Sequence, residues 1–501
     1  MHRAEKRKQA TYLRAGQPHT SLGRLVAEED DKLQEYYVGP EQYVQRALSS
    51  EDPAVFFRGP KGVGKSAILQ MVQVDRLSDE RRVIRISPDD LAFSALANVD
   101  ATTPLLQTFD RNHWLYKTLW DYVLSVEILR REYPDIPFLF QKIFQGKQEK
   151  QARRLLNLSL ADDGSTRTLT QRILDLVREV EISGEIVGGA QVSARVALGD
   201  TTPARGEHLS LLSQINVVAK SLGDHLRHTY FVLIDDLDLH WTDAPIQNAF
   251  IAALFASLKK LNGCALRFVV AIRDDIYHRL PLEDKDKSRE WVCAVSWSRP
   301  LVQEMITKRV SFAVGCPESE VWANVFPHGA FNTMWNATRA LPREVIRLST
   351  LCLEEARNNG NGRVESADMA SAVRRFSEEK IDDLGSERRH DLPGLDLLVR
   401  RFNGWPKEFP LERLHEFAIQ VAIDVQDKTR RAPQYSWAGG YVDNPLGLAR
   451  VLLECGVFLF KASRTAHHTP FDPLMNEDLR SDHWIAIHPI FAAGLGLVGE
   501  S

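Results

Sequence analysis

Eight consecutive residues carry the clearest chemical signal in this chain. They run from Gly59 to Ser66 and follow the pattern G-x-x-x-x-G-K-S, which is typical of the phosphate-binding loop of nucleoside-triphosphate enzymes. In such a loop the backbone N–H groups surround the β-phosphate at a helix N-terminus. We expect Lys65 to reach the β- and γ-phosphate oxygens and the Ser66 hydroxyl to ligate Mg²⁺. The loop therefore predicts a nucleoside triphosphate and Mg²⁺ as cofactors, and we expect the nucleotide to be ATP.

The segments on both sides of the loop agree with this interpretation. The apolar residues 54–57 predict a short buried strand before it, and residues 67–72 predict the first turns of a helix after it. The residues predicted to contact the nucleotide from this region are Gly59, Pro60, Lys61, Gly62, Val63, Gly64, Lys65, Ser66 and Ala67.

A phosphate-binding loop needs a partner carboxylate on a nearby strand. Residues 230–234 form a continuous apolar run, which predicts a parallel strand buried on both faces. Asp235 and Asp236 follow it, at the edge where open α/β sheets bind ligands. We expect Asp235 to bind Mg²⁺ and Asp236 to orient or deprotonate the attacking water. An Asp236 that caps a helix or simply lies in a loop is the alternative.

A further predicted strand, residues 266–272, ends in Arg273. An arginine at this strand tip can sense the γ-phosphate, because its guanidinium offers two parallel donors to phosphate oxygens. The alternative is an ion pair between Arg273 and Asp274 or Asp275 at the sheet edge. The predicted catalytic residues are Lys65, Asp236 and Arg273, and the predicted metal ligands are Ser66 and Asp235.

Together these motifs resemble the STAND/AAA+ branch of P-loop ATPases, and the Asp235 strand resembles the Walker B strand of KAP and STAND ATPases. Residues 37–41 resemble the element that packs on adenine, with Pro40 where that element has Arg. Residues 340–348 resemble the G-x-P segment of STAND lids and the sensor-2 helix of origin-initiator ATPases, with Ala340 in place of the family glycine. The resemblance implies nucleotide contacts by Val38, Gly39, Pro342 and Arg343.

Bulk properties restrict the class of protein. A length of 501 residues suggests about two to four domains, and 44% apolar with 26% charged residues is typical of a soluble globular protein. The net charge of −4 gives no overall field that attracts nucleic acid. Five scattered cysteines without C-x-x-C spacing predict reduced thiols, no zinc site and a cytoplasmic protein. We see no membrane-spanning run and no signal peptide.

The order of segments predicts several domains. About 170 residues separate Lys65 from Asp235, more than the sheet needs, so we expect an insertion. It has predicted helices at 104–133 and 169–180 and a predicted strand at 191–196, and it serves either packing or a partner contact. A strand at 82–86 and a helix at 209–226 flank it. The predicted domains are a basic tail (1–28), an ATPase core (29–299, with the insertion at about 100–205), a helical lid (300–385), a charged linker (386–390) and a winged-helix-like domain (390–501). For the basic tail we favour a solvated segment over a nucleic-acid-binding arm.

The last domain follows the order of a winged helix. Predicted helices at 392–402, 411–425 and 446–455 precede predicted strands at 457–461 and 484–487, with the wing between these strands. The third helix carries a single cation, Arg450, where a helix that reads bases needs several. We therefore favour a module that locks the nucleotide-bound state over one that reads DNA.

The sequence thus predicts an α/β P-loop NTPase with an inserted helical region, a helical lid and a C-terminal winged-helix domain. Its predicted function is a slow ATP-driven switch that controls oligomerisation or an effector protein, and the resemblance implies a role in bacterial stress response or phage defence. The alternatives are a DNA-associated ATPase of initiator or transposition-regulator type and a nucleotide-binding scaffold. The candidates for an arginine finger acting on a second copy are Arg279 and Arg299.

Overall fold

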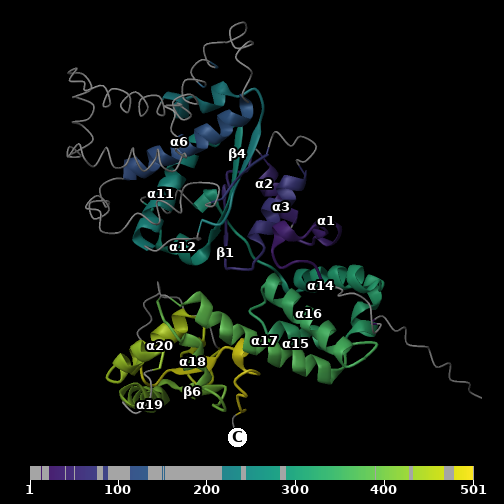
Figure 1. Ribbon diagram of the computed structural model, residues 1–501, viewed down its shortest axis with the longest axis vertical. Helices are drawn as coiled ribbons and strands as arrows, with labels where there is room; N and C mark the ends of the chain where they lie inside the picture. Colours follow the sequence, from purple (N-terminus) through teal and green to yellow (C-terminus); the bar gives the residue numbers. More distant parts are fainter. Residues whose placement is uncertain are drawn as a thin grey trace, which may run out of the picture. The chain divides into compact units, whose positions relative to one another are not determined.

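The computed structural model divides the chain into two compact units (Figure 1). The sheet unit comprises Val26–Gln34 and Gly39–Ser296, and the C-terminal unit comprises Met1–Leu25, Glu35–Val38 and Trp297–Ser501. The residues that the structure describes are 13, 22–39, 41–49, 51–75, 83–87, 113–133, 149, 152, 217–237, 244–263, 265–282, 289–389, 391–427, 433–467 and 479–499. The predicted helix at 169–180 and strand at 191–196 lie outside these residues.

The sheet unit is built on five parallel strands, which confirms the predicted α/β fold class. The continuous apolar run at 230–234 forms a strand that is buried at every position, as expected for a strand covered on both faces. The strands lie in the order β2 (Val83–Ile86), β3 (Tyr230–Ile234), β4 (Leu266–Arg273), β1 (Phe56–Gly59) and β5 (Val292–Ala294).

Strand β1 begins and ends two residues later than the sequence predicted. Its pairing with β4 runs from Phe56 opposite Val270 to Gly59 opposite Arg273. The ladder therefore continues into the first residue of the phosphate-loop motif. Because β1 and β4 are parallel, the loop and Arg273 leave the sheet at the same edge.

Helices cover both faces of this sheet (Figure 1). Helices α2 (Glu41–Leu48) and α3 (Lys65–Asp75) lie on one face, and α6 (His113–Glu132) and α11 (Ala244–Leu261) lie on the other. On the second face the rings of Phe56 and Phe255 stack with centroids 3.5 Å apart. A hydrogen bond of 3.0 Å from Trp120 Nε1 to the Phe250 carbonyl joins α6 to α11. Of the described helices, none is long and apolar enough to span a membrane.

The predicted helix at 209–226 is wrong in its last turn. Residues 217–220 are helical, but the short 3-10 helix η5 (Leu222–His225) follows them, and residues 209–216 are not described. The His225 ring bonds to the Ser221 carbonyl at 2.7 Å. The other short elements of this unit are η1 (Ala27–Glu29), α12 (Asp274–Arg279) and η6 (Arg289–Trp291), and α1 (Leu33–Tyr36) spans the change from this unit to the C-terminal one.

A buried arginine fastens the segment that leads into β1. Arg267, on β4, is 3% exposed, and its guanidinium donates to the carbonyl oxygens of Arg46, Ala47, Asp52 and Ala54 at 2.7–3.1 Å. Burial lowers the pKa of Arg267 from its usual value. Two of the four carbonyls belong to the last turn of α2 and two to the segment between α2 and β1, so this one side chain holds the approach to the phosphate loop in place.

The C-terminal unit begins with a helical region. Arg309, on the first long helix of this region, donates to the Leu22 carbonyl at 2.5 Å and lies 4.4 Å from the centroid of the Tyr36 ring. Leu13, Leu22 and Val38 are buried in the core of this unit, so three separate stretches of chain form it. Its first helices are α14 (Arg299–Val314), η7 (Glu318–Glu320), the π-helix η8 (Val321–Val325), α15 (Ala330–Asn336), α16 (Pro342–Asn358) and α17 (Ser366–Glu387).

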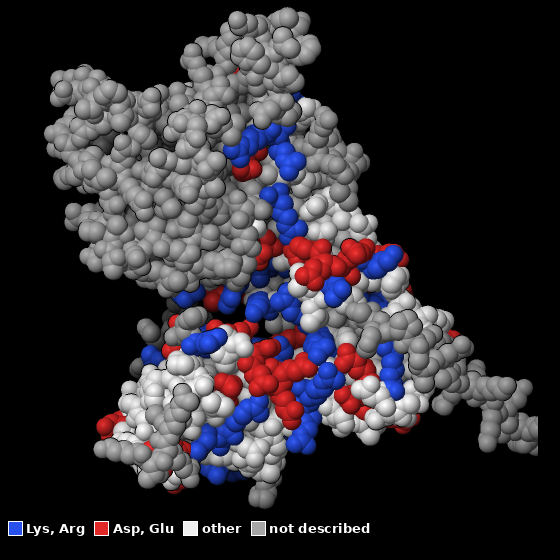
Figure 2. All heavy atoms as spheres, in the orientation of Figure 1, with Lys and Arg blue, Asp and Glu red and all other residues white. Residues whose placement is uncertain are grey.

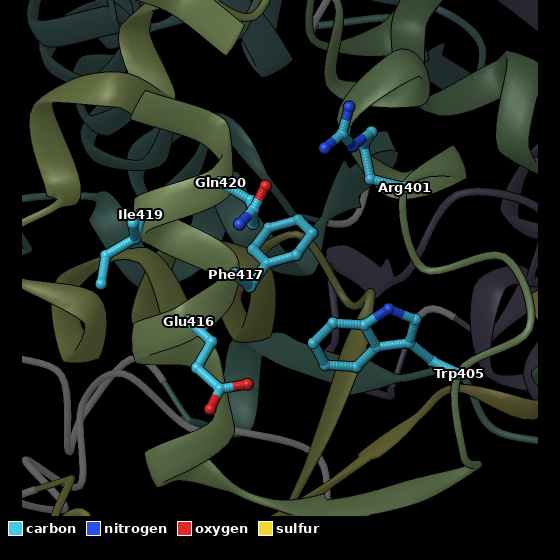
Figure 3. Close-up of a pocket in the computed structure, with 6 residues that line it drawn as sticks. All are labelled: Arg401, Trp405, Glu416, Phe417, Ile419 and Gln420. Carbon is cyan, nitrogen blue, oxygen red and sulfur yellow. The ribbon is translucent and has the colours of Figure 1, made fainter. Parts of the chain in front are cut away.

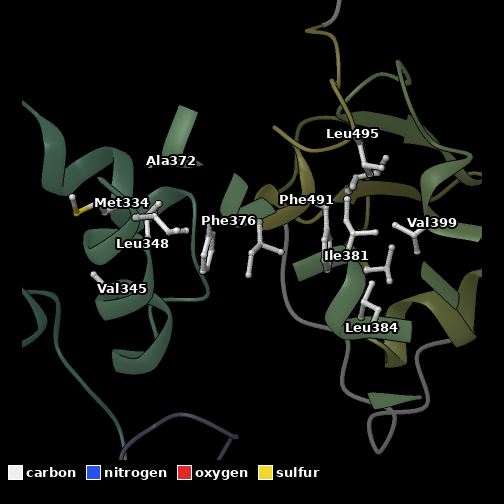
Figure 4. Packing of buried hydrophobic residues seen from close by; sticks show 14 of the residues in the cluster. Met334, Val345, Leu348, Ala372, Phe376, Ile381, Leu384, Val399, Phe491 and Leu495 are labelled. Atoms are coloured by element: carbon white, nitrogen blue, oxygen red, sulfur yellow. The ribbon is translucent and has the colours of Figure 1, made fainter. Parts of the chain in front are cut away.

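One hydrophobic core continues through the whole C-terminal unit (Figure 4). Helix α17 carries Phe376 beside the residues of α15 and α16, and carries Ile381 and Leu384 beside Phe491. The predicted lid and the predicted winged-helix region therefore share a core. The predicted linker at 386–390 is wrong at its start, because α17 continues to Glu387 and the Leu392 N–H bonds to the Arg388 carbonyl at 2.8 Å.

The remaining elements follow the predicted order of three helices and two strands. They are α18 (Leu395–Arg400), η9 (Leu411–Arg413), α19 (Leu414–Gln426), η10 (Ser436–Tyr441), α20 (Pro445–Glu454), β7 (Phe458–Lys461), β8 (Trp484–Ile487) and η12 (Pro489–Phe491). An additional short strand, β6 (Glu408–Pro410), pairs antiparallel with β8. The sheet order is β6-β8-β7.

Candidate functional site

The phosphate-loop motif forms a tight curl between β1 and α3. Gly62 and Gly64 have φ angles of 86° and 97°, in the left-handed region that glycine adopts without strain. The Val63 N–H bonds to the Pro60 carbonyl at 3.3 Å, and the Ile68 N–H bonds to the Gly64 carbonyl at 3.1 Å. Helix α3 begins at Lys65, so the loop leads directly into a helix N-terminus, where N–H groups and the helix dipole favour an anion.

Lys65 lies within this curl. Its ammonium donates to the carbonyl oxygens of Gly59 and Pro60 at 2.9 and 3.1 Å. Gly59 has no room for a side chain, because a Cβ there would lie 2.7 Å from Val63 Cγ1. The Lys65 ammonium is thus held against the backbone at the start of the curl.

The buried carboxylate of Asp235 lies at the tip of β3. Asp235 is 5% exposed, and its Oδ1 accepts the Asp236 N–H at 2.9 Å. Its Oδ2 accepts no hydrogen bond from the described residues. Burial raises the pKa of this carboxyl, and the side chain of Ser66 and the backbone of Asp236 partly oppose that rise.

These two oxygen-bearing side chains fit a magnesium site. A buried carboxylate oxygen without a hydrogen-bond donor is costly unless a cation or donor approaches it. Ser66 and Asp235 both offer oxygen atoms, which Mg²⁺ prefers. The described residues contain no cluster of three or more metal-binding side chains. Magnesium does not need one, because it usually keeps several waters and takes further oxygens from substrate phosphates.

Asp236 turns the chain at the tip of β3. Its φ angle is 56°, and its side chain is exposed while Asp235 is buried. Aspartate adopts this left-handed conformation more readily than most residues. The turn therefore sends adjacent carboxylates in different directions, one into the protein and one to the surface.

Arg273 adopts the alternative that the sequence left open. Its Nε and Nη2 each lie 3.0 Å from an oxygen of the Asp275 carboxylate. Arg279 also donates from Nε to the Asp275 carbonyl at 3.0 Å. The sheet register places Arg273 opposite Gly59 at the start of the loop. A sensor role would require Arg273 to exchange its carboxylate partner for a phosphate.

Sequence reasoning missed a second group of polar residues beside Asp235. Arg85 of β2 has its Nη2 at 4.0 Å from Asp235 Oδ2, and the same nitrogen donates to the Glu28 carboxylate. Its Nη1 donates to Gln70 of α3 at 3.3 Å. The available signal was a lone charge in the otherwise apolar Val-Ile-Arg-Ile strand.

The predicted adenine contacts lie where the chain passes from one unit to the other. Val38 is 7% exposed and belongs to the core of the C-terminal unit, whereas Gly39 belongs to the sheet unit. Pro40, which stands in place of the family arginine, lies outside the described residues. Nucleotide binding by Val38 and Gly39 stays a prediction.

The predicted lid contacts lie at the start of α16. Pro342 is the first residue of this helix, where the fixed φ of proline suits a helix start, and Arg343 follows it in the first turn. Ala340, just before the helix, has a φ angle of 61°, the conformation that glycine would adopt without strain. The backbone at Ala340 therefore has a conformation that favours glycine, the residue type of the family segment that Ala340 replaces. Nucleotide binding by Pro342 and Arg343 stays a prediction.

The two arginine-finger candidates are both engaged within their own units. Arg279 bonds to Asp275, as described above. Arg299 bonds to the Asn332 side chain and lies 5.7 Å from the ring centroids of both Phe331 and Trp335. Neither is distinguished as a finger by these contacts.

Three cations in or beside the wing region are also engaged. Lys461 is 6% exposed and pairs with Glu408 of β6. Arg464 lies 5.5 Å from the centroid of the Trp484 ring, and Arg480 pairs with Asp482 at 3.4 Å. On the face of the C-terminal unit seen in Figure 2, acidic and basic side chains are interspersed. Wing residues 468–478 are not among those described.

A separate pocket of about 440 Å³ lies in the C-terminal unit (Figure 3). Trp405 and Phe417 are its aromatic lining residues, and Arg401 and Glu416 are its charged ones. Arg401 pairs with Asp424 at 2.5 Å. The remaining lining residues are Ile419 and Gln420 of α19.

The parallel sheet, the loop and the carboxylate at the tip of β3 give this protein the α/β fold of P-loop NTPases. Residues 300–385 match the family described as the FunZ-associated C-terminal helical domain. No curated protein matches the chain. The family match covers a helical part of the C-terminal unit and includes neither the phosphate loop nor the Asp235 strand.

Several solved structures have weak similarity to the chain. The Aeropyrum pernix ORC1 protein in complex with DNA is 11% identical over 94% of this chain and 95% of its own, with a TM-score of 0.39. The A. pernix ORC2 protein in ADPNP–ADP complexes is 10% identical over 93% and 97%, with a TM-score of 0.38. Drosophila ORC bound to DNA is 13% identical over 98% and 94%, with a TM-score of 0.33. Similarity at this level carries no conclusion about function.

Proposed function

We propose that this protein is a slow ATP-hydrolysing switch of the STAND/AAA+ type, whose nucleotide state controls its oligomerisation or an effector protein. The observation that carries the proposal is the pairing of a curled phosphate loop holding Lys65 with the buried Asp235 carboxylate. The loop donors suit a triphosphate. The Asp235 oxygen that accepts no hydrogen bond from the described residues suits its cation.

The roles of the site residues follow from their positions. The loop N–H groups and the Lys65 ammonium bind and orient the phosphates. Ser66 and Asp235 would hold Mg²⁺, which neutralises phosphate charge when bound. Asp236, exposed at the strand tip, is the candidate for orienting the attacking water. Its side chain is one methylene shorter than glutamate, which favours slow turnover.

The switch function depends on the helical region that follows the sheet unit. The family match at residues 300–385 covers the region predicted to be a lid. In this proposal Pro342 and Arg343, in the first turn of α16, couple the nucleotide to the C-terminal unit. The role in stress response or phage defence rests on the resemblance of the motifs alone.

A DNA-associated ATPase is the second candidate. The element order of α18, α19, α20, β7 and β8 supports it, because this is the order of a winged helix. Against it, α20 exposes one cation, Arg450, and buries Leu448 and Leu452. We therefore favour the switch.

Neutralising each of the two adjacent aspartates should have different effects. We expect Asp235→Asn to reduce the Mg²⁺ dependence of ATP binding, because its buried oxygen is assigned to the cation. We expect Asp236→Asn to leave binding unchanged and to lower turnover by roughly a hundredfold, within the range of lost general-base assistance. Calorimetry and a phosphate-release assay measure the two effects. Wild-type turnover in both variants would show that β3 does not carry the catalytic carboxylates.

The size of the protein in solution tests the proposed function directly. The switch predicts that ATP, but not ADP, changes the oligomeric state measured by light scattering, and that duplex DNA has no further effect. The DNA-associated ATPase predicts an assembly that forms only with duplex DNA and weakens steeply with salt. A single unchanged mass under all conditions, with ATP bound, would favour the nucleotide-binding scaffold.

A further inference from the structure

Arg85 lies between two carboxylates that come from distant parts of the chain. Its Nη2 is 4.0 Å from Asp235 Oδ2 at the tip of β3, and it also donates to Glu28 of η1. Its Nη1 donates to Gln70, on the helix that follows the phosphate loop. One guanidinium therefore contacts the phosphate-loop helix and an N-terminal segment, and lies 4.0 Å from the candidate metal carboxylate.

The two carboxylates differ in their access to water. The Asp235 side chain is 7% exposed, whereas that of Glu28 is 31% exposed. A guanidinium that pairs with the buried carboxylate competes directly with a cation for the same oxygen, whereas one that pairs with the outer carboxylate leaves that oxygen accessible. The hydrogen bond to Glu28 and the longer separation from Asp235 place Arg85 in the second arrangement.

We propose that Glu28 and Arg85 form a charge switch that sets how strongly the candidate metal site binds Mg²⁺. Glu28 draws the guanidinium away from Asp235 and so favours the cation. Loss of the Glu28 contact lets Arg85 turn to Asp235 and displace the cation. This inference rests on the proposed function, because it assigns a regulator to the same site.

The location of Glu28 suits a regulatory role. It lies in Val26–Gln34, a short segment of the sheet unit. The segments before and after it in the sequence, Met1–Leu25 and Glu35–Val38, both belong to the C-terminal unit. A displacement of either neighbouring segment would pull on the segment that carries Glu28. The switch thereby gives the metal site an input that does not pass through the phosphate loop.

The test compares ATP dissociation constants in excess EDTA and in excess Mg²⁺. The constant in EDTA divided by the constant in Mg²⁺ gives a ratio that reports the coupling between metal and nucleotide, whatever the turnover. We expect Glu28→Gln to lower this ratio by about threefold to tenfold, because the freed guanidinium competes with Mg²⁺. We expect Arg85→Met to raise it by a similar factor, and the double variant to behave like Arg85→Met. Thermal unfolding in EDTA checks that each variant folds.

The matched control is Glu29→Gln, which removes the adjacent, exposed acid of the same short helix. It should leave the ratio unchanged. If the two residues had a purely structural role, Glu28→Gln and Arg85→Met would change the ratio in the same direction. That result would overturn the proposed switch. An unchanged ratio in Glu28→Gln would overturn it too. Absence of ATP binding by the wild-type protein would instead refute the proposed function.

Discussion

Lys65→Ala should remove nearly all ATP binding. The ammonium is held inside the loop by the carbonyl oxygens of Gly59 and Pro60, where phosphate oxygens would take over as its partners. A hydrogen bond to a charged group contributes about 1.5–3 kcal/mol, so the loss of contacts to two phosphates should weaken binding by a factor of roughly one hundred or more. Isothermal calorimetry with ATP and Mg²⁺ measures this change.

Lys61→Ala is the matched control for this variant. Lys61 lies in the same loop, but its side chain is exposed, so it is expected to contribute only its backbone N–H. ATP affinity should therefore stay within a few-fold of the wild-type value, as for other exposed charges. Equal affinity in Lys65→Ala and the wild-type protein would refute the phosphate-loop assignment and with it the proposed ATPase.

Arg267→Met should destabilise the protein more than any surface substitution. It would leave four backbone carbonyls without the guanidinium that now donates to them. A buried group that loses its hydrogen-bond partner costs about 1–3 kcal/mol, so the free energy of unfolding should fall by roughly 3 kcal/mol or more. Chemical denaturation in the absence of nucleotide measures the change.

Arg46→Met provides the comparison for this prediction. Arg46 pairs with Asp52 at 2.7 Å in the same region, but its side chain is 38% exposed. Exposed ion pairs contribute about 0–1 kcal/mol, so the loss should be much smaller. Equal losses in the two variants would mean that the four carbonyls do not depend on Arg267.

The sequence predicted the parts of this fold that local patterns determine. The boundaries of β3 and β8 agree with their apolar runs, and the loop glycines mark the curl between β1 and α3. The start of β1 could not be read locally, because its ladder depends on the register with β4. Strand β6 was missed because it is three residues long and ends in Pro410.

Contacts between distant residues explain the remaining differences in the site. The charge of Arg85 was visible in the sequence, but its partners Glu28 and Asp235 come from distant parts of the chain. By contrast, the pairing of Arg273 with Asp275 spans two residues, and it was one of the two alternatives that the sequence left open. Sequence patterns thus identified the candidate reacting groups better than the groups that surround them.

The chain crosses between its two units several times, and this limits where it can be cut into fragments that fold separately. Three junctions near the N-terminus, after Leu25, Gln34 and Val38, join the units in addition to the one after Ser296. Cleavage after Ser296 would therefore leave each fragment incomplete, because Leu13 and Leu22 of the C-terminal core would remain on the first fragment. Neither unit corresponds to one continuous stretch of gene. Separately expressed halves should regain a complete core only by associating with each other.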